Sequence, residues 1–265
     1  MRRLTSFPCA GETLAATLDE APGTTGLLIV SGGNETRIGA HRGMAELAHA
    51  LSAAGHPTFR YDRRGIGDST GENNGFESSA DDIYEAAAAF RREAPHLTRI
   101  VAFGNCDAAS ALILFHAAAG IDALVLTNPW TSDGNDALPP AAAIRSRYLE
   151  KLTNPRELIR LATGGVSISK LISGLSKIAA KRSQPATSLP RRLAAALEAA
   201  TVPVTILLAR RDNTALAFVD HWEGKGFAGC RARTATHSCD TDSHSFARPQ
   251  DKAWLTQQIL AALKA

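Results

Sequence analysis

Apolar runs with strand character alternate along this chain with helical patterns, and this alternation constrains the fold more than any other feature. Such an order is typical of a mostly parallel α/β sheet with helices on both faces. The strand-like runs are 26–33, 57–69 (strand and loop), 99–107, 121–130 and 202–213, and the helical patterns are 41–56, 79–94, 108–120 and 251–265.

The alternation breaks after Trp130. Residues 131–200 contain short helical segments separated by TNP, TGG and SQPATSLP, which are turn and loop signals. We therefore predict one α/β core, made of 1–130 and 201–265, with a helical lid or cap insertion at 131–200. Within it, residues 166–178 place apolar side chains on one helical face, which either covers the core or lines an acyl pocket.

Size and composition exclude several classes of protein. With 265 residues and 45% hydrophobic side chains, the chain can bury one substantial core. Its four cysteines have no CxxC or zinc-like spacing, and we expect no metal and no cofactor. The N-terminus lacks the apolar core of a signal peptide, and no apolar run approaches the roughly 18 to 20 residues of a membrane span. We expect a cytoplasmic protein without an integral membrane segment, and a homodimer stays open.

Positive charge is concentrated in the insertion. Residues 131–200 hold eleven Lys and Arg against five Asp and Glu, although the whole chain carries only +3. The surplus is either a solvated face or an attraction for an anionic part of a substrate, a carrier or a membrane surface. The net charge alone does not indicate a nucleic-acid partner, and we expect none.

The stretch VAFGNCDAAS places Cys106 where an apolar strand meets a helix. This is the position of the G-x-S-x-G nucleophile elbow, in which small neighbours allow a sharp turn that lifts the central side chain above the sheet. Gly104 keeps the first small position and Ala108 replaces the second glycine. A helix N-terminus and an assisting base lower a thiol pKa from about 8.5 to ~3.5–7.5. Cys106 is therefore either a nucleophile, which we predict, or a small buried residue.

An acid and a histidine follow the cysteine in the order that elbow hydrolases use. Asp212 ends the strand-like TILLARRD, and His244 lies in DTDSHSF before the last helical pattern. We predict that His244 deprotonates Cys106 and later protonates the leaving group, while Asp212 orients the imidazole. His237 is the rival base, and Asp133, after LTNPW, is the rival acid.

Acyl transfer also requires two backbone N–H groups that face the developing oxyanion. The segment SGGNETR follows the first buried strand, and we expect the amide of Gly33, or that of Asn34, to pair with the amide of Asp107. The alternative is that these glycines only form a turn.

The chain resembles the exosortase A system-associated hydrolases of type one over nearly its whole length. The residues that carry the resemblance are SGGNETRIGAHRGMAELAHALSAAGHPTFRYDRRGIGDSTG, with a D-x-R-G-x-G-x-S pattern from Asp62 to Ser69, then GNCDAAS and SRYLEKLTNPRELIRL. The resemblance implies the α/β-hydrolase fold, a cysteine-centred elbow and a cytoplasmic bacterial hydrolase in an exopolysaccharide context. It does not imply a substrate.

The RIGAHR segment matches family positions near the expected mouth of the site. We expect Arg37, His41 and Trp130 to contact the substrate. The alternative is that the RIGAHR side chains form a loop-ordering hydrogen-bond network, like the pair we predict between Asp62 and Arg64.

A thiolate nucleophile attacks esters, thioesters and activated lactones and forms an acyl-thioenzyme. We therefore predict an acyl hydrolase or acyltransferase for a small ester or thioester, with the basic insertion meeting a phosphorylated carrier. The alternatives are a dienelactone-type lactone hydrolase and an α/β-hydrolase-like binding protein without turnover.

Overall fold

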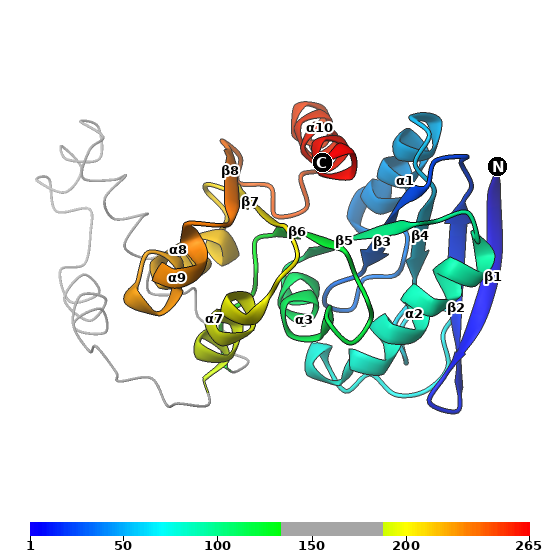
Figure 1. Ribbon diagram of the computed structural model, residues 1–265, viewed down its shortest axis with the longest axis horizontal. Helices are drawn as coiled ribbons and strands as arrows, with labels where there is room; N and C mark the ends of the chain where they lie inside the picture. Colours follow the sequence, from blue (N-terminus) through cyan, green and yellow to red (C-terminus); the bar gives the residue numbers. More distant parts are fainter. Residues whose placement is uncertain (134–187) are drawn as a thin grey trace, which may run out of the picture.

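One sheet organises the computed structural model, which describes residues 1–133 and 188–265 (Figure 1). The strands lie in the order β1-β2-β4-β3-β5-β6-β7-β8. β1 pairs antiparallel with β2 and β2 antiparallel with β4, whereas the neighbours from β4 to β8 pair in parallel. The strands are β1 (Arg2–Cys9), β2 (Glu12–Asp19), β3 (Thr25–Val30), β4 (Thr58–Tyr61), β5 (Arg99–Asn105), β6 (Ala123–Thr127), β7 (Val204–Ala209) and β8 (Ala235–Cys239).

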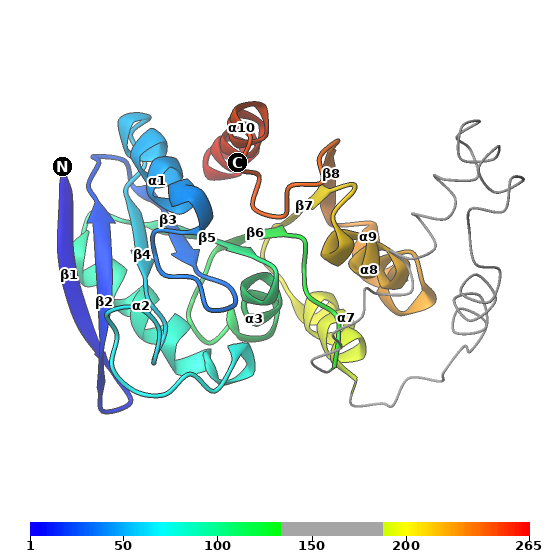
Figure 2. The ribbon, with the colours of Figure 1, turned by 180° about the vertical axis from the view of Figure 1, so that it is seen from behind.

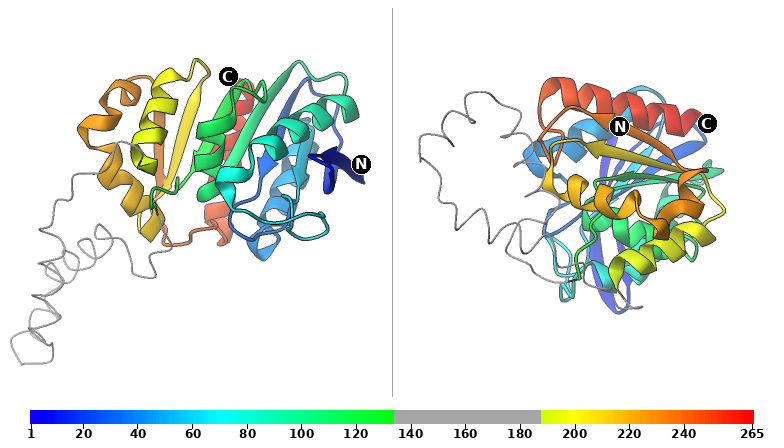
Figure 3. Two further views of the ribbon diagram at one scale, coloured as in Figure 1. Left: turned by 90° about the horizontal axis from the view of Figure 1, so that it is seen from below. Right: turned by 90° about the vertical axis from the view of Figure 1, so that its left-hand side faces the viewer.

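Helices cover both faces of this sheet (Figures 2 and 3). One face packs on α1 and α10, and the other on α2, α3, α7 and α8. The helices are α1 (Gly43–Ala53), α2 (Ala80–Glu93), α3 (Asp107–Phe115), α7 (Leu189–Ala199), α8 (Asn213–Trp222), α9 (Ala228–Arg231) and α10 (Pro249–Lys264), with short 3-10 turns η1 (Ala40–Arg42), η2 (Phe76–Ser78) and η3 (Lys225–Phe227). The predicted fold, an α/β-hydrolase fold with a mostly parallel sheet between helices, is confirmed.

The central strands are apolar on both sides because both of their faces are covered. In β3, Leu27 and Ile29 enter the core beneath α1 and α10, whereas Leu28 and Val30 enter the opposite core. Successive side chains of a strand point to opposite faces, so a strand buried on both sides reads as a continuous apolar run. This is the physical reason that 26–33 and 99–107 were recognisable in the sequence.

Two edge elements lie outside the predicted pattern. β1 and β2 form a hairpin whose turn residues, Ala10 and Gly11, both have positive φ, at 50° and 85°. Two-residue turns of this kind match the twist of the paired strands, but an Ala-Gly pair is a weaker signal than Asn-Gly. At the other edge β8 is mostly exposed and contains no apolar run. Neither edge of the sheet was therefore predicted from the apolar pattern.

Most of the predicted insertion at 131–200 falls on 134–187, outside the described residues, and so does the helix expected at 166–178. The range also includes α7, which is described. Its Leu189, Leu193 and Leu197 are buried in the same core as α3. Among the helices of 1–133 and 188–265, none has the length and apolarity that a membrane crossing requires.

Candidate active site

Cys106 lies at a sharp turn between β5 and α3. Its backbone has φ 61° and ψ −125°, a conformation that side-chain-bearing residues rarely adopt. The turn is held by hydrogen bonds from the Cys106 N–H to the carbonyl of Thr127 (3.0 Å) and from the Trp130 N–H to the carbonyl of Cys106 (3.2 Å). The partly exposed Cys106 side chain therefore stands at the carboxyl end of the sheet.

Small residues on either side make this turn possible. A Cβ on Gly104 would lie 2.8 Å from the carbonyl carbon of Ala108, so a side chain there would force α3 away from β5. Ala108 itself is fully buried, and its methyl group is accommodated where a glycine is usual in the elbow motif. The elbow geometry predicted around Cys106 is thus present despite the Ala108 departure.

Asp212 and His244 meet beside this turn. Asp212 is the N-cap of α8, and its Oδ2 accepts hydrogen bonds from the N–H groups of Thr214 and Ala215, both at 3.1 Å. The same oxygen lies 3.0 Å from Nδ1 of His244. The carboxylate is fixed by the helix and in turn fixes the imidazole, which leaves Nε2 of His244 for a second partner.

The second partner of His244 is Cys106. Burial lowers the pKa of His244, but hydrogen bonds with Asp212 and Cys106, and the charges of both groups, outweigh burial and raise that pKa to about 10. The ring is therefore protonated at neutral pH, and the structure brings Cys106, His244 and Asp212 together. This arrangement suits a histidine that donates a proton to a leaving group.

The rival residues lie elsewhere. His237 is exposed on β8, and no contact joins it to Cys106 among the described residues. Asp133 accepts a hydrogen bond from the N–H of Leu189 at the start of α7, and among the described residues the carboxylate that pairs with His244 is that of Asp212. The geometry favours Asp212 and His244 over both alternatives.

Two asparagines that the sequence analysis missed position the histidine loop. Asn128 is fully buried at the end of β6 with φ 43°, and its Oδ1 accepts the N–H of Ala209. Its Nδ2, like that of Asn105, donates to the carbonyl of His244, at 3.2 and 3.3 Å. Asn128 thereby ties β6, β7 and the histidine loop together. Its place after the strand-like run ALVLT was the available signal, because polar groups at the carboxyl ends of parallel strands face the site.

The expected oxyanion donors are only partly arranged as predicted. Gly33 and Asp107 lie beside Cys106, but the Gly33 N–H donates to Oδ1 of Asp107 at 2.6 Å. Asn34 is exposed, and its side chain accepts a hydrogen bond from Asn73. The side chain of Asp107, which the sequence analysis did not consider, is therefore part of the site.

A cavity of about 470 Å³ opens beside the cysteine. Phe76, Trp130 and Leu189 form apolar parts of its wall, and Glu77 and Arg192 form an ion pair at it. Trp130, which was expected to contact the substrate, lines this cavity. The indole Nε1 of Trp130 donates to the carbonyl of Ser132 at 2.9 Å, which fixes the ring against the cavity.

Arg37 and His41 do not line this cavity. The guanidinium of Arg37 pairs with the buried carboxylate of Asp62 and, at 2.9 Å, with Asp68. His41 is exposed in a left-handed backbone conformation, with φ 51°. The contacts of Arg37 correspond to the loop-ordering alternative, since they join the RIGAHR segment to the loop after β4.

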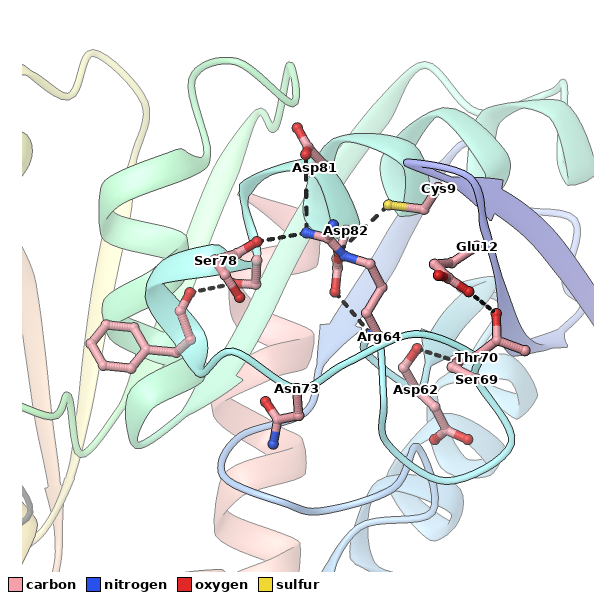
Figure 4. A network of polar contacts seen from close by, with 12 residues as sticks. Cys9, Glu12, Asp62, Arg64, Ser69, Thr70, Asn73, Ser78, Asp81 and Asp82 are labelled. Carbon is pink, nitrogen blue, oxygen red and sulfur yellow. Dashed lines mark hydrogen bonds and ion pairs between the residues drawn. The ribbon is translucent and has the colours of Figure 1, made fainter.

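The predicted pair between Asp62 and Arg64 is wrong. Arg64 turns away from Asp62 and pairs with the buried Asp82, and it donates to the carbonyl of Ser78 at 2.7 Å (Figure 4). Asp82 also lies 3.5 Å from the thiol of Cys9. Arg64 lies in the loop after β4, and its side chain reaches Asp82 in the N-terminal turn of α2 instead of Asp62.

The sheet order, the elbow and the histidine beyond the last strand define an α/β hydrolase. A family model described as serine aminopeptidase, S33, matches residues 25–216, and the chain belongs to this hydrolase family. At the sharp turn between β5 and α3 this chain carries Cys106. No curated protein matches the chain. Across residues 1–133 and 188–265, no group of three His, Cys, Asp or Glu side chains could hold a metal ion.

Solved structures show the same fold at low sequence identity. An esterase of Pyrococcus furiosus is 15% identical with a TM-score of 0.66, over 100% of this chain and 91% of that one. The thioesterase domain of the curacin biosynthetic pathway is 14% identical with a TM-score of 0.60, over 98% and 99%. The proline iminopeptidase of Mycobacterium smegmatis is 16% identical with a TM-score of 0.59, over 98% and 99%.

Proposed function

We propose that this protein hydrolyses an acyl ester or thioester through an acyl-thioenzyme on Cys106, with His244 as acid and base and Asp212 as its orienter. One observation carries the proposal: His244 bridges Asp212 and Cys106 at the strained turn between β5 and α3. A thiolate is the nucleophilic form of cysteine, and a protonated histidine beside it completes the pair.

The reaction proceeds in two halves. The Cys106 thiolate attacks the carbonyl carbon, a C–S bond forms, and the carbonyl oxygen becomes an oxyanion. When this intermediate collapses, the bond to the leaving group breaks and the His244 imidazolium gives its proton to the leaving oxygen or sulfur. In the second half the neutral imidazole takes a proton from water, and the resulting hydroxide attacks the acyl carbon. The C–S bond then breaks, which restores the Cys106 thiolate and releases the carboxylic acid as product.

Support for an acyl substrate comes from the cavity wall and from the related folds. Phe76, Trp130 and Leu189 offer apolar surface beside Cys106. The similar structures include proteins named as an esterase and as a thioesterase domain. An acceptor other than water would turn the same intermediate toward acyl transfer, and a lactone would enter it by ring opening.

The cellular role that we propose rests on the sequence. Resemblance to the exosortase A system-associated hydrolases favours a cytoplasmic role in exopolysaccharide production. In that setting 131–200 acts as a lid whose positive charge meets a carrier-bound substrate, and the protein acts as a monomer or a homodimer.

A substrate panel tests the proposal. Acyl thioesters and aryl esters of several chain lengths are offered to the wild type, to Cys106→Ala and to Cys230→Ala as the matched control. We expect turnover in the wild type and in Cys230→Ala, and none in Cys106→Ala. A Cys106→Ala variant as active as the wild type would contradict the proposal. Tight substrate binding without turnover in any variant would favour the binding-protein alternative.

A further inference from the structure

The carboxylate of Asp107 accepts the hydrogen bond of the Gly33 N–H, which a substrate carbonyl oxygen would need during acylation. Its Oδ1 accepts the Gly33 N–H at 2.6 Å, and both residues line the cavity beside Cys106. A hydrogen bond from an amide to a carboxylate is about twice as strong as one to a neutral oxygen. The packing around it is close, because a Cβ on Gly32 would lie 2.7 Å from the same Oδ1.

This carboxylate conflicts with the chemistry at Cys106. During acylation the carbonyl oxygen becomes negative and must be held by backbone N–H groups. Two negative oxygens that approach one N–H donor at the same time repel each other. The Gly33 N–H can therefore stabilise the oxyanion only after the side chain of Asp107 has left it.

Arg63 is a second partner for the carboxylate of Asp107. The Arg63 side chain is only 4% exposed, and one guanidinium nitrogen lies 3.9 Å from Oδ2 of Asp107. The same nitrogen donates to the carbonyl of Gly33. The Nε of Arg63 has no hydrogen-bond partner among the described residues. A buried guanidinium with an unused donor gains stability from a close carboxylate.

We propose that Asp107 is a latch on the oxyanion hole and that Arg63 receives it. In the free protein the Asp107 carboxylate holds the Gly33 N–H, and when substrate binds it turns to Arg63 while the carbonyl oxygen takes its place. Arg63 is then a positioning residue that acts through Asp107. The inference rests on the proposed function, since it concerns the acylation of Cys106.

The test measures the rate at which p-nitrophenyl acetate acylates Cys106 in a single turnover. The variants are Asp107→Ala, Arg63→Met, Arg63→Lys and the double variant Asp107→Ala/Arg63→Met. Because a charge-assisted hydrogen bond no longer has to break, Asp107→Ala acylates about tenfold faster than the wild type. Arg63→Met acylates about tenfold slower, since the latch has lost its receiver, and Arg63→Lys restores most of the rate. The double variant behaves like Asp107→Ala, because Arg63 matters only while Asp107 is present.

Two controls separate a latch from a general structural effect. Arg60→Met removes another buried arginine, whose Nε also has no partner among the described residues, but this arginine pairs with Asp19 at 3.5 Å. Its acylation rate stays at the wild-type value. The plateau rate of Cys106 alkylation by iodoacetamide also stays constant in every variant, because alkylation forms no oxyanion.

The other outcomes decide separately on the latch and on the proposed function. Equal acylation rates in the wild type, Asp107→Ala and Arg63→Met overturn the latch and leave Cys106 as the nucleophile. Losses in acylation and alkylation that run in parallel, with lower melting temperatures, also overturn the latch and show a structural role. If Cys106 is acylated in none of the proteins, the proposed function fails and the latch with it. Acylation that occurs only in Asp107→Ala supports the latch.

Discussion

At the scale of single residues, the proposed chemistry depends on the proton that His244 holds. Its pKa is raised to about 10 from an ordinary value of 6.5, because hydrogen bonds with Asp212 and Cys106 outweigh the effect of burial. The histidine is therefore protonated through the neutral range and can act as an acid toward a poor leaving group. Deprotonation above pH 10 removes that acid.

A pH profile of acylation with an alkyl thioester checks this assignment. In the wild type we expect the rate to fall as the pH rises through about 10, where His244 loses its proton. Asp212→Asn removes the charge that helps to raise this pKa, so the alkaline limb moves to lower pH and the rate drops by roughly 10²- to 10⁴-fold. Asp133→Asn is the matched control and keeps the wild-type limb. The reverse pattern would assign the acid to Asp133.

At the scale of elements, the residues of the candidate site follow β5, β6, β7 and β8, and α7 packs in the same core as α3 and lines the cavity with Leu189. Only part of this was readable from the sequence. Cys106 and Asp212 were predictable because each follows a buried strand within one to three residues, and such strands are continuous apolar runs. The position of Asn128 after a strand-like run places it near the site, but its role depends on contacts with two other segments, and the role of the Asp107 side chain depends on the loop after β3, so neither role can be read from the local sequence.

The structural role of α7 can be tested by shortening one buried side chain. Leu193 is fully buried against the core that includes α3. Leu193→Ala should lower the free energy of unfolding by about 2–5 kcal/mol, because it leaves a cavity between packed layers. Arg191→Ala, at an exposed position of the same helix, should change it by no more than about 0.5 kcal/mol. Urea denaturation measures both, and equal effects would show that α7 is not part of the core.

At the scale of the whole molecule, the fold distinguishes one cysteine from the other three. Burial raises the pKa of the Cys9 thiol to about 12, and burial also raises those of Cys230 and Cys239. Iodoacetamide at neutral pH should therefore label Cys106 in the folded protein, and all four cysteines in concentrated urea. Peptide mass spectrometry of both samples checks this. Equal labelling of Cys239 and Cys106 in the folded protein would contradict it.

The central claim, covalent catalysis by Cys106, is tested most directly by trapping the acyl-thioenzyme. The wild-type protein is mixed with an activated acyl thioester, quenched in acid within the first turnover and analysed by intact and peptide mass spectrometry. We expect one acyl group per chain, located on the peptide that contains Cys106, and no adduct in Cys106→Ala. An acyl group on another residue, or hydrolysis that persists in Cys106→Ala, would contradict the account.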